Sequence, residues 1–286
     1  MSAGFGARLE AQLTVRGRLC LGIDPLPELL ERWDLPVSAS GAERFALTAL
    51  DAAAEHVGVV KPQIAFFERF GADGYKVLEQ VIPEARSRGL LVIADVKRGE
   101  IGTSMDGYAH AWLHPSSALA ADAMTVNPYL GVGTLAGTLA LAEEFGKGLF
   151  ALAATSNPEA VAQQRSGDPS LSARVATEVA AVNRTRIRTA QAAGEKAQLG
   201  PFGLVVGATV SLRDYGVDPN SLAGTPILCP GVGAQGGDLE ALPEVLGTLV
   251  AGTVVSQSRS ILGAGPRGLH DALERESEAV ERALSR

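Results

Sequence analysis

The sequence predicts an α/β fold and, within that class, a (β/α)8 barrel of the TIM-barrel type. Short apolar runs of strand length recur along the 286 residues, segments with helical hydrophobic spacing separate most of them, and glycine and proline mark the junctions. The runs are at residues 19–23, 57–60, 90–94, 123–126, 149–154, 203–208, 226–229 and 253–256. Strands that alternate with helices in this number are typical of a closed parallel barrel.

The segments between the runs favour helices. Residues 45–54, 74–88 and 171–192 carry apolar side chains at helical spacing. A doubly wound open sheet is the alternative arrangement, but no Gly-x-Gly-x-x-Gly follows the first run, which weakens its dinucleotide-binding version. Residues 3–16 are predicted to form a helix ahead of strand one that could plug the base of the barrel. Because the sequence has no convincing linker, we expect residues 1–286 to form a single barrel domain.

Composition and charge exclude several classes of protein. The formal net charge is −7, from 25 basic and 32 acidic residues, and no basic run stands out, so the chain is not expected to bind nucleic acid. The apolar runs are too short to span a membrane. Cys20 and Cys229 lie inside apolar runs, which indicates core residues in a reducing compartment. No CxxC or Cys/His ligand spacing appears, so the sequence does not indicate a structural zinc site. The sequence therefore predicts a cytoplasmic protein.

The most informative segment follows the third apolar run, where Asp95, Lys97 and Glu100 stand close together. Asp95 and Lys97 are two residues apart, so in an extended chain their side chains point to the same side. Burial of charge is costly, and charges crowded at the end of a buried strand are therefore usually paired or functional. A solvated loop is the alternative, which the strongly apolar strand disfavours.

Polar residues also follow other predicted strands, at the end of the barrel where enzymes of this fold carry their chemistry. They are Asp24 after strand one, Lys61 after strand two, Asn127 after strand four, residues 155–157 after strand five, the glycine-rich loop 231–237 after strand seven and Arg259 after strand eight. A glycine-rich loop and an arginine after the last two strands are typical of a phosphate site. None of the four histidines follows a predicted strand, so the proton donor should be a lysine.

Together these motifs resemble the orotidine 5′-phosphate decarboxylase family, in its longer bacterial form, over nearly the whole chain. The resemblance is carried by residues 21–25, 59–62, 95–101, 126–131, 155–158 and 230–237, together with Arg259. Residues 95–101 are similar to the family's Asp-x-Lys-x-x-Asp-Ile signature. Glu100 replaces the usual aspartate, and Ser104 replaces the usual threonine. A glutamate keeps the charge but is one methylene longer, so it must fold back or shift the loop.

The resemblance implies a carboxy-lyase that converts orotidine 5′-monophosphate to uridine 5′-monophosphate in de novo pyrimidine synthesis. It implies no cofactor and no metal, and a homodimer with shared active sites. The implied catalytic residues are Lys97, which would protonate C6 of the pyrimidine, with Asp95, Lys61 and Glu100. The implied substrate-binding residues are Asp24 at the ribose, Ser104 in the neighbouring subunit's site, Ser156 at the pyrimidine edge, Pro230 beside the ring, and Gln235 and Arg259 at the 5′-phosphate.

Two other functions stay open at this point. A metal-dependent sugar-phosphate decarboxylase or aldolase of the same barrel superfamily would carry an acidic residue at the end of strand two, where this chain has Lys61. A non-catalytic pyrimidine-nucleotide-binding barrel would not need both Asp95 and Lys97. Turnover of orotidine 5′-monophosphate with and without a chelator distinguishes the three functions.

Overall fold

The computed structural model describes residues 3–233 and 236–285, and within these residues eight parallel strands close into a barrel. Each strand pairs with the next along the chain, and β8 pairs with β1. The strands are β1 (Leu19–Ile23), β2 (Val59–Pro62), β3 (Leu91–Arg98), β4 (Ala123–Val126), β5 (Gly148–Ala154), β6 (Phe202–Val206), β7 (Ile227–Pro230) and β8 (Thr253–Gln257). The prediction of a (β/α)8 barrel is confirmed, and the open-sheet alternative is wrong.

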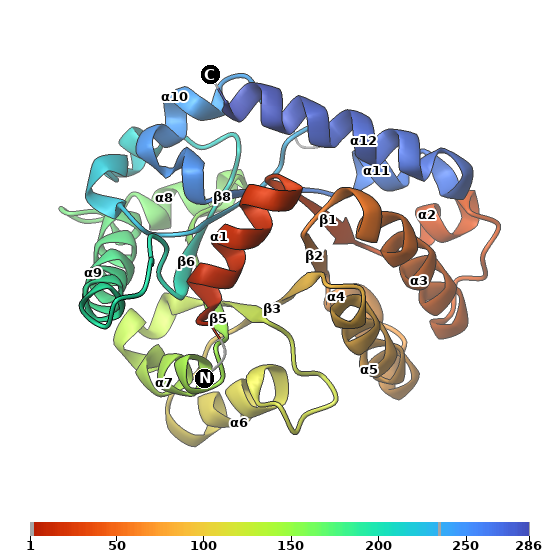
Figure 1. The fold of residues 1–286 in the computed structure, drawn as a ribbon, viewed down its shortest axis with the longest axis horizontal. Coiled ribbons are helices and arrows are strands. Elements are labelled where there is room, and N and C mark those ends of the chain that lie inside the picture. Colours follow the sequence, from red (N-terminus) through yellow and green to blue (C-terminus); the bar gives the residue numbers. More distant parts are fainter. Residues whose placement is uncertain (1–2, 234–235, 286) are drawn as a thin grey trace.

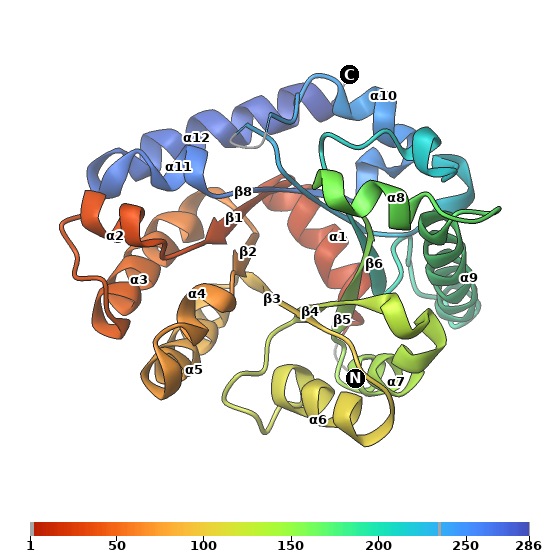
Figure 2. The ribbon, with the colours of Figure 1, turned by 180° about the vertical axis from the view of Figure 1, so that it is seen from behind.

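Helices surround the barrel (Figures 1 and 2). They are α1 (Phe5–Arg16), α2 (Pro27–Arg32), α3 (Ala39–His56), α4 (Ala65–Glu68), α5 (Gly71–Ser87), α6 (Gly102–Leu113), α7 (Ala136–Glu144), α8 (Val161–Gln164), α9 (Leu171–Ala192), α10 (Leu242–Leu246), α11 (Arg259–Leu262) and α12 (Gly265–Leu284). The side chain of Ser170 accepts a hydrogen bond from the Ala173 N–H at 3.0 Å, which explains why α9 begins where the sequence predicts. In the described chain, none of these helices is long and apolar enough to cross a membrane.

The strand boundaries differ from the predictions mainly at β3. The apolar run ends at Ala94, but the strand continues to Arg98, and its pairing with β4 shifts register between these two residues. This irregularity bends the strand end at the point where its charged residues begin. The connection between β6 and β7 also differs from its neighbours, because it contains only the 3₁₀ turns Leu212–Tyr215 and Pro219–Leu222.

Helix α1 lies across the amino-terminal end of the barrel (Figure 1). Phe5, Leu9 and Leu13 are buried there, and they pack with barrel-lining side chains such as Phe150. The Phe5 ring meets Phe150 edge-on, with the ring centroids 5.9 Å apart. A side chain at Gly148 would collide with Phe5, so the absence of a Cβ at Gly148 lets this ring enter the barrel.

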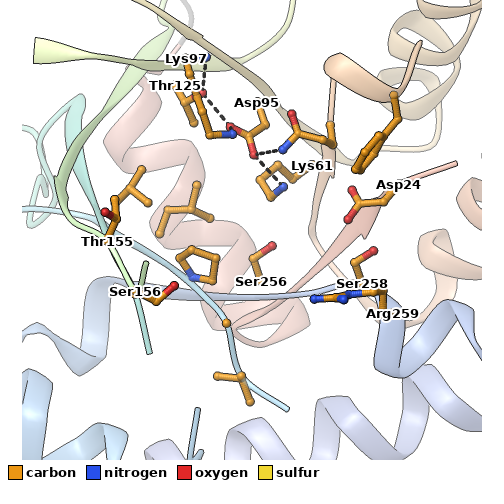
Figure 3. A pocket seen from close by; sticks show the side chains of 18 of the residues that line it. Asp24, Lys61, Asp95, Lys97, Thr125, Thr155, Ser156, Ser256, Ser258 and Arg259 are labelled. Carbon is orange, nitrogen blue, oxygen red and sulfur yellow. Dashed lines mark hydrogen bonds and ion pairs between the residues drawn. The ribbon is translucent and has the colours of Figure 1, made fainter. Parts of the chain in front are cut away.

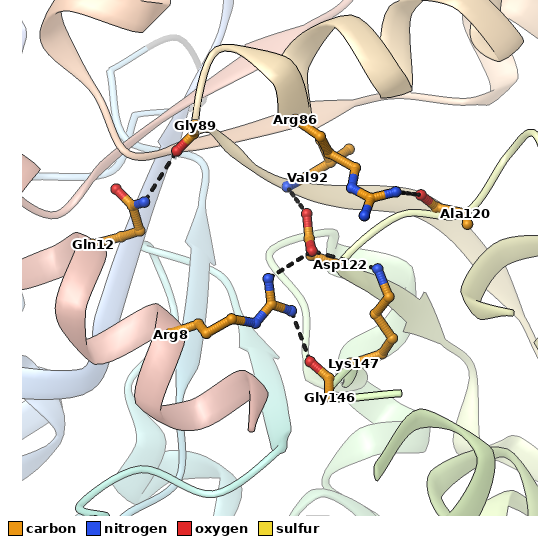
Figure 4. Close-up of polar contacts among 9 residues, drawn as sticks. All are labelled: Arg8, Gln12, Arg86, Gly89, Val92, Ala120, Asp122, Gly146 and Lys147. Atoms are coloured by element: carbon orange, nitrogen blue, oxygen red, sulfur yellow. Dashed lines mark hydrogen bonds and ion pairs between the residues drawn. The ribbon is translucent and has the colours of Figure 1, made fainter. Parts of the chain in front are cut away.

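A polar network holds α1 at this position (Figure 4). Arg8 donates one hydrogen bond to Asp122 Oδ1 at 2.8 Å and another to the carbonyl oxygen of Gly146 at 2.7 Å. Asp122 also accepts from the N–H of Val92 at 3.0 Å and lies 3.5 Å from the ammonium of Lys147. Burial would raise the pKa of Asp122, but the charges of Lys147 and Arg8 outweigh it and lower that pKa. Asp122 therefore stays ionised and links α1 to the strands.

Candidate active site

A cavity of about 520 Å³ opens at the carboxyl end of the strands, opposite α1 (Figure 3). This is the end at which barrel enzymes carry their chemistry. The predicted site residues that line it are Asp24, Lys61, Asp95, Lys97, Ser156, Pro230 and Arg259. They come from six different strands or the segments directly after them, so only closure of the barrel brings them together.

Asp95 is the centre of the charged part of this cavity. Its Oδ2 accepts hydrogen bonds from Lys61 Nζ at 3.0 Å and from Gln63 Nε2 at 2.8 Å. Its Oδ1 accepts from Lys97 Nζ at 2.6 Å and from Thr125 Oγ1 at 2.9 Å. Each carboxylate oxygen thus has one charged and one neutral donor. Such a complete set of donors fixes the carboxylate plane and, with it, the positions of both ammonium groups.

The electrostatics of this cluster keep Asp95 and Lys61 charged. Burial alone would raise the pKa of Asp95, but Lys61 and Lys97 outweigh it and hold that pKa well below its usual range. Burial alone would likewise lower the pKa of Lys61, yet the negative charges of Asp95 and Asp24 raise it above its usual range. Lys61 is buried, whereas the side chain of Lys97 is 44% exposed and faces the cavity. Lys97 is therefore the more exposed of the two ammonium groups that line the cavity.

The backbone of Lys97 has a left-handed conformation, with φ at 47°. For a residue other than glycine this conformation costs about 1–2 kcal/mol, so neighbouring contacts must hold it. The N–H of Lys97 donates to Thr125 Oγ1 at 2.9 Å, and the next side chain, Arg98, is paired with Glu68 of α4. Glu68 also accepts from the Tyr75 hydroxyl at 2.7 Å. These contacts fix the end of β3 and aim Lys97 at Asp95.

The opposite part of the cavity is lined by polar groups, among them the guanidinium of Arg259 and the carboxylate of Asp24. Arg259 begins α11, and Ser156 and Pro230 also line the wall (Figure 3). Asp24 Oδ1 and Ser258 Oγ are buried and have no hydrogen-bond partner among the described residues. Buried polar atoms are normally paired, so the Asp24 oxygen indicates a place for a hydroxyl donor of a ligand, and the Ser258 hydroxyl a place for another polar group. The predicted phosphate residue Gln235 lies outside the described residues.

Two predicted site residues do not reach the cavity of their own chain. Glu100 bends back, and its Oε1 accepts from the N–H of Ile101 at 2.9 Å. Ser104 is exposed on the first turn of α6. Neither lines the cavity within the described residues, so the prediction that they serve a neighbouring subunit's site is not tested by a single chain.

Sequence reasoning missed Gln63 and Thr125, although both bond to Asp95. Gln63 lies two residues after Lys61, and this spacing puts both side chains on the same side of an extended chain. Gln63 could therefore have been predicted as a site residue from the position of Lys61. Thr125 stands inside the apolar run of β4, where a β-branched residue is usually a packing choice. Only the pairing of β3 with β4 shows that its hydroxyl faces Asp95.

Comparisons with known proteins agree with this geometry. The family model described as "Orotidine 5'-phosphate decarboxylase / HUMPS family" matches residues 17–269. Orotidine 5′-phosphate decarboxylase of Corynebacterium efficiens is 45% identical over 271 residues, covering 93% of this chain and 92% of that protein. The Streptomyces coelicolor enzyme of the same name is 44% identical over 287 residues, covering 98% of each.

Solved structures give the same result. A Streptomyces avermitilis protein assigned as an orotidine 5′-phosphate decarboxylase has a TM-score of 0.89 and 44% identity, covering 100% of this chain and 97% of that one. The OMP decarboxylase of Leishmania donovani has a TM-score of 0.76 and 27% identity, covering 99% and 100%. Sequence, fold and cavity therefore agree, and the chain belongs to the orotidine 5′-phosphate decarboxylase family.

Proposed function

We propose that this chain decarboxylates orotidine 5′-monophosphate to uridine 5′-monophosphate, the final step in making that nucleotide during de novo pyrimidine synthesis. The observation that carries the proposal is the Asp95 carboxylate bonded to both Lys61 and Lys97 beside an open cavity. A reaction that leaves a pair of electrons on a ring carbon needs a positive charge already fixed beside that carbon. The cluster supplies it.

The step balances with the residues present. The bond between C6 and the carboxylate carbon breaks, the electron pair stays on C6, and carbon dioxide leaves. Lys97 Nζ stabilises that electron pair and then transfers a proton to C6. Asp95 lies beside the departing carboxylate, where two negative charges repel, and this repulsion falls as the carbon dioxide leaves. No cofactor takes part in this scheme.

The rest of the cavity binds the nucleotide. Arg259, with the glycine-rich loop that includes Gln235, binds the 5′-phosphate, and Asp24 accepts a hydrogen bond from a ribose hydroxyl. Ser156 contacts the pyrimidine edge and Pro230 the ring face. Binding energy from the phosphate, remote from the reacting carbon, holds the ring against the charged cluster and so contributes to the rate.

The direct test is incubation of the full chain with orotidine 5′-monophosphate, followed by loss of its absorbance and release of carbon dioxide. Turnover that is the same with and without a chelator supports the proposal. Turnover that the chelator abolishes supports a metal-dependent enzyme of the same superfamily. Tight binding without turnover supports the non-catalytic nucleotide-binding protein.

The active assembly is a homodimer in which Glu100 and Ser104 complete the partner's site. Apolar side chains exposed after β3 and β4 support this proposal: Ile101 is 58% exposed, Tyr108 38%, Tyr129 70% and Leu130 47%. They flank the segment that carries Glu100, so a second copy that covers them would also receive that segment. The free, buried cysteines Cys20 and Cys229 fit the proposed cytoplasmic location.

Complementation tests the shared site. Lys97→Ala and Glu100→Ala proteins are each inactive on this proposal, and mixing them with subunit exchange gives heterodimers with one intact site. Recovery of activity supports the shared site. Exchange without recovery shows that Glu100 acts within its own chain, and an active Glu100→Ala protein shows that it has no essential role.

A further inference from the structure

Three side chains that offer metal ligands converge on the outside of the barrel, away from the mouth cavity. Glu55 and His56 end α3, and His270 lies in the second turn of α12. His56 Nε2 lies 3.2 Å from His270 Nδ1, which in turn lies 3.6 Å from Glu55 Oε2. The three ligand atoms all lie within 4.8 Å of one another.

The two shorter separations, from His270 to His56 and to Glu55, fit ligands of one tetrahedral ion. Two atoms bound to zinc at its usual length of about 2.0–2.1 Å stand roughly 3.3 Å apart at a tetrahedral angle. The 3.2 Å and 3.6 Å separations bracket this value. The two imidazole rings are not stacked: their planes cross at 68° with centroids 5.4 Å apart.

We propose that Glu55, His56 and His270 bind a divalent transition-metal ion of the zinc class, which bridges α3 and α12. Imidazole nitrogens with one carboxylate oxygen form a ligand set that suits zinc, cobalt, nickel and copper. The side chains of His270 and Glu55 are 51% and 70% exposed, so water completes the coordination from the solvent side.

The ion stabilises the fold and has no part in the chemistry at the mouth. Its ligands lie far apart in the sequence and meet only in the folded chain, so the folded state binds the ion more tightly than the unfolded state. The bridge holds the C-terminal helix α12 against α3. Because α12 packs against α11, which begins with Arg259, the bridge also supports the wall of the barrel behind the proposed phosphate site.

The chain's other histidine pair provides a matched control. His110 and His114 stack face to face, with centroids 4.2 Å apart and planes 9° apart. His114 Nδ1 lies 2.7 Å from Ser116 Oγ. In this pair the ring faces meet and one nitrogen is already engaged, so it does not offer two converging ligands.

The test is calorimetric titration of zinc chloride into the full chain after chelator treatment. We expect one site in the wild type and in the His110→Gln/His114→Gln variant. We expect His270→Gln to bind at least about tenfold more weakly. Saturating zinc should raise the Tm of the wild type and of the control variant by roughly 5 °C, and that of His270→Gln by much less.

Two results would overturn the proposal: zinc binding by His270→Gln that equals that of the wild type, or loss of binding in the control variant. If His270→Gln has a lowered Tm in chelator alone, His56→Gln replaces it in the same titration. Cobalt gives an independent reading, because a tetrahedral site shows strong visible absorption. That absorption should appear in the wild type and disappear in either His56→Gln or His270→Gln.

Discussion

The buried hydroxyl of Thr125 should matter for turnover, because it contacts both ends of the Asp95–Lys97 pair. It donates to Asp95 Oδ1 at 2.9 Å and accepts from the Lys97 N–H at 2.9 Å. Thr125→Val keeps the shape of the side chain and removes both bonds. An unsatisfied group in such a place costs about 1–3 kcal/mol, and the strained backbone of Lys97 loses its support. If the full loss occurs in the transition state, kcat falls roughly 5- to 150-fold.

The assay is the absorbance change of orotidine 5′-monophosphate, with kcat and KM measured separately. KM should change little, because Thr125 lies away from Arg259 and the proposed phosphate site. Thr138→Val is the matched control: Thr138 is also buried, but its hydroxyl has no hydrogen-bond partner among the described residues. The control should keep wild-type kcat. A kcat within about twofold of wild type for Thr125→Val would show that the Thr125 hydroxyl does not support the Asp95–Lys97 pair, since it corresponds to less than one lost hydrogen bond.

Three further predictions concern other parts of the molecule. Arg259→Ala should raise KM roughly tenfold or more in steady-state kinetics, which is more than the loss of an exposed ion pair, worth about 0–1 kcal/mol, would cause. A smaller rise in KM would mean that the phosphate binds elsewhere. Asp122→Ala removes the partner of the buried Lys147 and should lower the free energy of unfolding by roughly 3 kcal/mol in urea, whereas a loss under about 1 kcal/mol would show that the pair is not stabilising. Since the lysines lower the pKa of Asp95, its contribution to stability is complete above its unfolded value of about 3.9 and is lost as pH falls through the folded value. In Lys61→Met the pKa of Asp95 rises, so the acid limb of kcat/KM should move to higher pH, and an unmoved limb would contradict the assigned cause.

Much of the fold could be predicted because buried parallel strands are apolar on both faces and so stand out in the sequence. Apolar character alone predicts that β3 ends at Ala94, four residues too early, because the charged residues that continue the strand into the cavity are not apolar. The 3₁₀ turns in the connection after β6 could not be predicted either, since this segment, which includes Pro219, has no helical periodicity.

The charged part of the site was visible in the sequence because Asp95, Lys97 and Lys61 are costly to bury and therefore conspicuous. The role of Thr125 could not be predicted, because a threonine in a strand is consistent with packing alone. Its hydroxyl reaches Asp95 only because β4 pairs with β3. On the proposed shared site, Glu100 acts on a second copy of the chain, so its contacts would form only across an interface between two chains.

The central claim is that Lys97 protonates and stabilises the carbon from which carbon dioxide leaves. Single-turnover decarboxylation of orotidine 5′-monophosphate by Lys97→Ala tests it most directly, with circular dichroism to show that the fold is kept. We expect a rate lower by at least about three orders of magnitude, roughly 4 kcal/mol, while uridine 5′-monophosphate still binds. A rate within about tenfold of wild type, or 1.4 kcal/mol, would contradict the claim and place the proton donor elsewhere.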